Sequence, residues 1–136
     1  MKITIETTVR APLPRVWECF NNAEHVVHWN NASSDWHTPR AENDFRQGGA
    51  FNYRMEARDG SFGFDFKGIY DEVRPMQWVA YTMEDGRKVE IAFRVEPGEV
   101  RIVETFEAET ENTPEKQREG WQSILNNFKR YVEENK

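Results

Sequence analysis

Alternation of apolar and polar residues between positions 51 and 106 is the feature that most limits how this chain can fold. A strand with one buried face alternates in this way, because successive side chains point to opposite faces of a sheet. Tight-turn dipeptides separate the alternating stretches, namely DG at 59–60, DG at 85–86 and PG at 97–98. The predicted strands are 51–57, 62–67, 78–83, 89–95 and 100–106. Together they predict a meander of antiparallel strands joined by tight turns.

The N-terminal segment adds one more strand and two short helices. Residues 3–9 (ITIETTV) also alternate and predict a first strand. Pro12 and Pro14 suit the first turn of a helix over about 12–21, because the N–H groups that proline lacks have no helical partner there. Residues 23–29 (AEHVVHW) predict a second short helix.

The C-terminal segment predicts one long helix. Thr113 suits the N-cap and Pro114 the first helical position. An apolar stripe follows at helical spacing, formed by Trp121, Leu125, Phe128 and Val132. The order of elements therefore predicts an α+β fold, in which an antiparallel sheet of about six to seven strands carries the long helix across one face.

Composition excludes several classes of partner. The 136 residues carry 18 basic and 24 acidic side chains, a net charge of −6, and no basic run. We therefore expect neither nucleic acid nor an anionic membrane surface as a partner. The single cysteine, Cys19, cannot form an internal disulfide, no apolar run is long enough to span a bilayer, and the N-terminus reads as a strand. These features predict a cytoplasmic protein.

Motifs for catalysis and cofactor binding are absent from the sequence. The chain has no GxSxG, no GxGxxG and no P-loop, so we expect no cofactor and nominate no catalytic residue. His25 and His28, three residues apart, could share a helix face and a metal ion. Because no HExxH motif or Cys/His pair accompanies them, we interpret them as solvated histidines and expect no metal site.

The segment WNNASSDWHTPRAENDFRQGG, residues 29–49, contains two tryptophans and almost no aliphatic residue. Trp29 and Trp36 flank a predicted linker between the second short helix and the sheet. Trp29 and Trp36 either pin this linker to the body of the protein or cover the entrance of a pocket, with His37 nearby as a polar contact.

Several motifs, spread from end to end in this order, resemble one known family. They are AP (11–12) with VWECF (16–20), HW (28–29), NDFRQGGAF (43–51), FKGIYDEVRP (66–75) and GWQSILNNFKRYV (120–132). The chain resembles the START-like superfamily, also called SRPBCC or birch-pollen-allergen-like, in its branch of homologues of the activator of heat-shock protein 90 ATPase. The resemblance implies a single START-like domain over residues 1–136 with a helix-grip architecture.

The resemblance also implies a function. Members of the superfamily typically bind lipids, sterols, polyketides or other apolar molecules in a cavity between the curved sheet and the C-terminal helix. We therefore expect binding of an apolar or aromatic small molecule without catalysis. The alternatives are an enzyme of the polyketide cyclase/hydrolase type that uses the same cavity, and a chaperone or stress-response interaction module. The eukaryotic activators carry a separate chaperone-binding domain, for which 136 residues leave no room.

The candidate ligand-binding residues are those that the alternation, the helical stripe and the two linker tryptophans direct toward this cavity. They are Trp29, Trp36, His37, Phe51, Tyr53, Phe64, Phe66, Phe93, Glu104, Trp121 and Leu125. The alternative for most of them is an ordinary filled core.

Glu104 is the most informative of these candidates. It shares its strand phase with Val100, Ile102 and Phe106. On an inward face it would be a carboxyl group in an apolar cavity, which requires a partner or a raised pKa. The alternative is an exposed glutamate on an edge strand.

Two glycine positions carry conformational predictions. Gly48-Gly49 predicts a turn that needs positive φ, braced by Asp44 and Arg46. Gly120 interrupts the long helix. It is either a tolerated fault, a point of close approach to the sheet, or space for a ligand at the cavity mouth.

Overall fold

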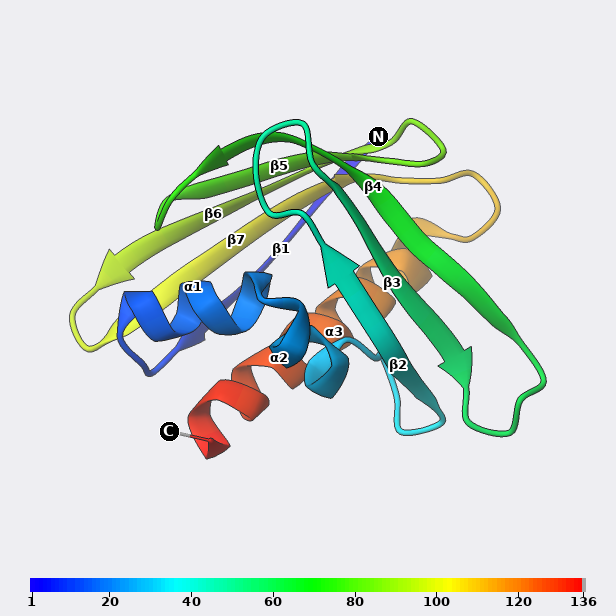
Figure 1. Cartoon of the computed structure of the whole chain (residues 1–136), viewed down its shortest axis with the longest axis horizontal. Helices are drawn as coiled ribbons and strands as arrows, with labels where there is room; N and C mark the ends of the chain where they lie inside the picture. Colours follow the sequence, from blue (N-terminus) through cyan, green and yellow to red (C-terminus); the bar gives the residue numbers. More distant parts are fainter. Residues whose placement is uncertain (136) are drawn as a thin grey trace.

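The computed structural model describes residues 1–135 (Figure 1). The strands are β1 (Lys2–Val9), β2 (Trp36–Asn43), β3 (Ala50–Ala57), β4 (Gly63–Arg74), β5 (Trp78–Met83), β6 (Lys88–Glu96) and β7 (Glu99–Glu107). The helices are α1 (Leu13–Asn21), α2 (Ala23–Trp29) and α3 (Pro114–Glu134).

Within residues 1–135, seven strands form one antiparallel sheet in the order β1-β7-β6-β5-β4-β3-β2. Consecutive strands from β2 to β7 are neighbours, and β1 completes the sheet beside β7. Figure 1 shows that the sheet curls over α3, with α1 and α2 on the same concave side. Helix α3 packs against β1 and helix α2 against β2, at the two edges of the sheet, while α1 contacts the interior strands β6 and β7.

This architecture confirms the predicted α+β, helix-grip fold. The predicted strands and helices recur with similar bounds, and the two short helices follow β1. Strand β4 continues to Arg74, beyond the predicted end at residue 67. The inward phase persists through Gly68 and Tyr70, after which the register with β5 shifts between Tyr70 and Glu72.

Strand β2 begins at Trp36, where the predicted linker ends, in a stretch for which no separate strand is predicted. Its sequence, WHTPRAEN, lacks regular alternation and contains Pro39, which cannot donate a hydrogen bond to a neighbouring strand. In the structure β2 is the edge strand beside β3, and its register shifts between His37 and Arg40, around the proline. An edge strand with a bulge tolerates a proline because no second neighbour needs the missing donor.

The turn between β2 and β3 has the predicted bracing. Arg46 donates to the Asp44 carboxylate at 2.9 Å, and the Gly49 N–H donates to the Arg46 carbonyl at 2.9 Å. Gly48 has a φ of +84°, in the left-handed region that favours glycine. At Gly49 the Asp44 carbonyl oxygen occupies the position that a Cβ would need. The two glycines are therefore required for different reasons.

Helix α3 begins as the sequence predicts. The Thr113 side chain accepts a hydrogen bond from the Lys116 N–H at 3.2 Å, and Pro114 is the first helical residue. The stripe residues Leu125, Phe128 and Val132 are buried against the sheet and the short helices. No helix within residues 1–135 is long and apolar enough to cross a membrane.

Candidate functional site

A cavity of about 270 Å³ lies between the inner face of the sheet and α3. Residues at the ends of α1 and α2 contribute to its wall, and most of the lining is apolar or aromatic. The lining residues are Phe20, Asn21, Trp29, Asn30, Phe51, Tyr53, Met55, Phe64, Phe66, Tyr70, Val79, Tyr81, Arg87, Ile91, Glu104, Trp121, Ile124 and Leu125.

Phe51 is the centre of the aromatic wall that the sheet supplies. Its ring centroid lies 4.9 Å from that of Tyr81, 5.1 Å from that of Tyr53 and 5.8 Å from that of Phe66. A Cβ at Gly68 would lie 3.0 Å from the Phe51 ring and would overlap the Thr82 carbonyl oxygen of the next strand. The absence of a side chain at Gly68 therefore lets the Phe51 ring lie across β4.

Trp121 forms the facing wall on α3. Its ring lies parallel to that of Phe106 on β7, with centroids 4.1 Å apart and planes inclined by 7°. The Phe66 ring meets it edge-on at 6.1 Å. Leu125, one turn further along α3, is buried and also lines the cavity. Aromatic contacts from two strands thus fix the orientation of the indole.

Among the described residues, Glu104 is the only acidic one in the lining. It lies on β7, which is an interior strand between β1 and β6, so the edge-strand alternative does not apply. Its neighbours in register are Ile5 and Ile91, and the residue is only 7% exposed. Burial away from water raises the pKa of the Glu104 carboxyl from 4.5 to about 8, and no group within residues 1–135 opposes the shift. The carboxyl group is therefore mostly protonated at neutral pH.

Three tyrosines place hydroxyl groups along the same wall. The Tyr70 hydroxyl lies 3.5 Å from that of Tyr53 and accepts a hydrogen bond from the Asn43 amide at 3.1 Å. The same Asn43 amide donates to the Asn21 carbonyl at 2.7 Å, which ties β2 to the end of α1. Burial raises the pKa of all three tyrosines, and for Tyr81 the charge of Glu104 adds to the shift. All three hydroxyls are therefore neutral hydrogen-bonding groups.

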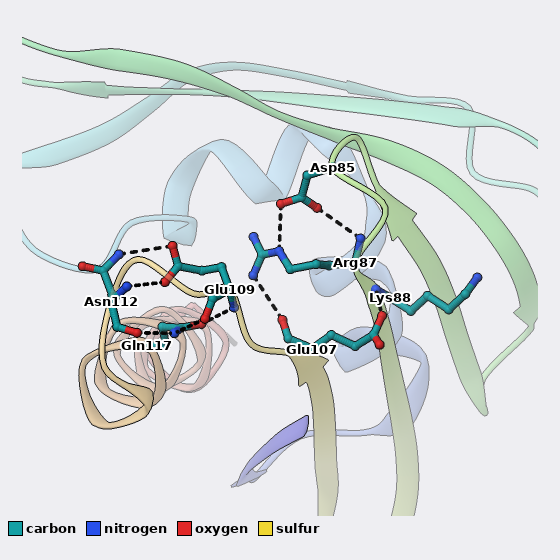
Figure 2. Close-up of polar contacts among 7 residues, drawn as sticks. All are labelled: Asp85, Arg87, Lys88, Glu107, Glu109, Asn112 and Gln117. Atoms are coloured by element: carbon teal, nitrogen blue, oxygen red, sulfur yellow. Dashed lines mark hydrogen bonds and ion pairs between the residues drawn. The ribbon is translucent and has the colours of Figure 1, made fainter. Parts of the chain in front are cut away.

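Within residues 1–135, Arg87 is the only basic residue in the lining, and it is already paired (Figure 2). Its guanidinium donates to the Asp85 carboxylate at 2.8 Å and to the Glu107 carbonyl at 3.1 Å. Beside it, Gln117 of α3 donates to the backbone carbonyls of Glu109 and Asn112 at 3.1 Å and 2.8 Å. These contacts hold the β5–β6 turn and the β7–α3 connection at one end of the cavity.

Three of the predicted ligand-binding residues do not line the cavity. Trp36 packs on the far side of Phe64, at 6.0 Å between ring centroids. His37 points away because the adjacent Thr38 takes the buried position and donates to the Asn30 carbonyl at 2.6 Å. Phe93 is buried deeper, where α1 covers it. Its ring lies 4.9 Å from that of Trp17.

Trp29 lines the cavity as part of α2 and does not lie in a loop at its entrance. Its indole N–H donates to the Cys19 carbonyl at 2.9 Å, and its ring meets Phe128 edge-on at 4.9 Å. A partly exposed aromatic cluster lies instead around Trp36. The centroid of its ring is 6.0 Å from the ring centroid of Phe62 and 6.0 Å from that of Phe64. Phe64, 40% exposed, connects this cluster with the cavity.

Sequence reasoning missed several lining residues. Val79 and Tyr81 share the inward phase of an alternating strand, a signal that could have identified them. Asn21 and Asn30 come from helix ends that only the tertiary fold brings to the cavity. Arg87 follows a turn and carries no pattern that points inward.

The histidines of α2 have other partners. His25 Nδ1 lies 2.7 Å from the Tyr131 hydroxyl, and the His28 ring stacks on the Tyr131 ring at 5.7 Å. Among residues 1–135, no group of three or more His, Cys, Asp or Glu side chains is arranged to hold a metal ion. A Cβ at Gly120 would meet no atom within 4 Å, so this glycine does not mark a close approach of the sheet.

A curved antiparallel sheet that grips a C-terminal helix over an aromatic cavity defines a helix-grip domain of the START-like class. The family model described as "Activator of Hsp90 ATPase homolog 1-like protein" matches residues 10–133, and the chain belongs to that family. The resemblance found in the sequence motifs is thereby confirmed.

Solved structures of similar chains agree with this assignment. The AHSA1-like protein from Aeromonas hydrophila is 46% identical, with a TM-score of 0.93 over 98% of this chain and 93% of that one. Chr148 from Cytophaga hutchinsonii is 47% identical, with a TM-score of 0.85 over the same shares. Protein NE0264 from Nitrosomonas europaea, 18% identical, has a TM-score of 0.82 over 98% and 95% of the two chains and shares the fold alone. No curated protein matched.

Proposed function

We propose that this protein binds an apolar or aromatic small molecule in the cavity between the sheet and α3, without catalysis. The observation that carries the proposal is the aromatic cavity itself, with its volume of about 270 Å³. Protein interiors normally pack with few voids larger than a water molecule, so a space of this size beside close-packed rings needs an explanation. Ligand pockets usually enclose roughly 300–1,000 Å³ and combine apolar walls with a few polar groups. The cavity is therefore suited to a small ligand.

The proposal is tested by titration with N-phenylnaphthylamine, an apolar dye whose fluorescence rises in an apolar environment. Two tryptophan substitutions form a matched pair. Ile124→Trp fills the cavity from the partly buried face of α3, whereas Val95→Trp adds the same side chain at a position that is 68% exposed. We expect the native chain and Val95→Trp to bind the dye alike and Ile124→Trp to lose binding. Equal binding by both variants, or no binding by the native chain, would contradict the proposal.

An enzyme of the polyketide cyclase/hydrolase type is the second candidate, and Glu104 favours it. A carboxyl group with its pKa near neutrality inside an apolar site suits general acid or base catalysis. Chemical analysis of the bound compound after incubation separates the two functions. A binder releases the compound unchanged, whereas an enzyme converts it at a rate that Glu104→Gln reduces without loss of binding.

Chaperone interaction is the alternative that the family description raises. It is tested by the ATPase rate of heat-shock protein 90 with and without the purified chain. A rate increase that survives filling of the cavity by Ile124→Trp would favour an interaction module over a small-molecule binder.

The cytoplasmic location remains a prediction, which fractionation of cells with an antibody to the chain would check.

A further inference from the structure

We infer that the ligand carries a carbonyl oxygen, which accepts hydrogen bonds from the Tyr81 hydroxyl and the Glu104 carboxyl group inside the cavity. The inference rests on the proposed binding function and specifies the chemistry of its ligand. An apolar ketone or a related neutral carbonyl compound is the class that this arrangement suits.

The two groups lie in neighbouring inward rows of the sheet, two strands apart, with β6 between them. Glu104 on β7 pairs with Ile91 on β6, and in the next inward row Tyr81 on β5 pairs with Val89. Both side chains line the same cavity, and the charge of Glu104 acts on the Tyr81 hydroxyl. A small ligand in this cavity can therefore contact both side chains.

Neither group has a partner within residues 1–135. Burial is the sole influence on the ionisation of Glu104, without a hydrogen bond or a nearby cation. The influences on Tyr81 are burial and neighbouring charges, again without a hydrogen bond. Tyr70 differs, because its hydroxyl already accepts a hydrogen bond from Asn43. Because both groups border the cavity, a ligand bound there supplies the hydrogen bonds that they lack within the protein.

Both free groups are donors at neutral pH. A neutral carboxylic acid in an apolar site can donate a hydrogen bond beside a tyrosine hydroxyl, and two such donors converge well on one carbonyl oxygen. A cationic ligand fits less well, because Glu104 would have to ionise and the Arg87 guanidinium lines the same cavity. An anionic ligand gains little from Arg87, whose charge Asp85 already neutralises at 2.8 Å.

Three naphthalene compounds of nearly equal shape test the inference: methyl naphthyl ketone, isopropenylnaphthalene and naphthylethylamine. The alkene replaces the carbonyl oxygen with a CH₂ group, and the amine replaces it with a cation. Affinities are measured by the quenching of tryptophan fluorescence and checked by NMR titration at pH 7. We expect the ketone to bind at least about tenfold more tightly than the alkene, because the alkene leaves two buried donors unpaired.

Substitutions connect this preference with the two residues. In Tyr81→Phe the ratio of ketone to alkene affinity should fall about three- to tenfold, because one donor is lost. In Glu104→Gln the side-chain amide still donates, so the preference for the ketone should persist. Raising the pH above 8 should weaken ketone binding by the native chain, as Glu104 ionises, but not by Glu104→Gln. The other ionisable groups in the lining are Tyr53, Tyr70, Tyr81 and Arg87. Burial raises the pKa of the three tyrosines above its usual value, so their hydroxyls stay neutral over this interval.

Each outcome has a separate meaning. Equal affinities for ketone and alkene would overturn the carbonyl inference and leave the binding proposal standing. Tightest binding of the amine would overturn it in favour of a cation paired with ionised Glu104. A ketone preference that Tyr81→Phe leaves unchanged would remove Tyr81 from the site and overturn the two-donor arrangement. Failure of all three compounds to bind at millimolar concentration would overturn the binding proposal together with the inference.

Discussion

The indole of Trp121 lies flat on the ring of Phe106, with centroids 4.1 Å apart and planes inclined by 7°. This stack joins α3 to β7 at the point where the cavity begins. Phe106 is fully buried on one side of the contact, while Trp121 lines the cavity on the other. The stack therefore belongs both to the core that holds the fold together and to the wall of the site.

Removal of the Phe106 ring should destabilise the protein strongly. Phe106→Ala deletes a fully buried aromatic side chain and leaves Trp121 without its stacking partner, so we expect a loss of about 3–5 kcal/mol in the free energy of unfolding. Phe62→Ala, at a position that is 64% exposed, should change it by less than about 0.5 kcal/mol. Urea denaturation followed by circular dichroism measures both. Similar losses for the two variants would contradict the placement of Phe106 in the core.

Glu104 should make stability fall as the pH rises. Its pKa is about 8 in the folded protein, whereas in the unfolded chain it returns to about 4.5. Between these values the unfolded state loses the proton and the folded state keeps it, so folding becomes less favourable by up to about 1.4 kcal/mol per pH unit. At pH values below the pKa of the unfolded chain, and above the pKa of the folded protein, the contribution of Glu104 to the free energy of unfolding no longer changes with pH.

Glu104→Gln removes that titration and serves as its control. We expect the variant to be the more stable protein at pH 8 by an amount on the order of a few kcal/mol, with a smaller difference at pH 5. Urea denaturation of both proteins across this range checks the difference. A difference that stays constant with pH would show that Glu104 ionises normally and is exposed to solvent in solution.

Two glycine-to-alanine substitutions should have opposite effects. At Gly68 a Cβ would overlap the Thr82 carbonyl oxygen and press on the Phe51 ring, so Gly68→Ala should destabilise the sheet by at least about 1–3 kcal/mol. At Gly120 a Cβ meets no atom within 4 Å, and alanine favours the helix, so Gly120→Ala should stabilise the protein by up to about 1 kcal/mol. Thermal unfolding of the two variants compares them directly. A destabilising Gly120→Ala would indicate that the sheet approaches α3 more closely there.

The Tyr70 hydroxyl should contribute more to stability than that of Tyr53. Tyr70→Phe removes the acceptor of the Asn43 amide at 3.1 Å, which should lower the free energy of unfolding by about 1 kcal/mol. Tyr53→Phe removes only the 3.5 Å contact with Tyr70 and should have a smaller effect. Chemical denaturation of each variant and of the double variant measures the difference. The reverse order would mean that Tyr53 makes the stronger hydrogen bond.

Local patterns predicted most strands because β3, β5, β6 and β7 each have one buried face. Local patterns do not predict strand β2, because an edge strand with Pro39 and a bulge needs no alternation of apolar and polar residues. The inward direction of Glu104 followed from the same period of two that orients Ile102 and Phe106. The period of two does not show where along the sheet the cavity ends. For that reason the sequence places Phe93 in the cavity, although α1 covers its ring.

The order of the elements, the inner face of most strands, the capped start of α3 and the family can all be read from the amino-acid sequence. Those properties depend on neighbours within a few residues, or on motifs that can be read along the chain. The three-dimensional structure was needed to show that space remains between Trp121 and the Phe51 wall, that β7 is an interior strand, and that Tyr81 and Glu104 line one cavity. Such properties depend on how side chains from distant strands and helices fill, or fail to fill, the volume between them.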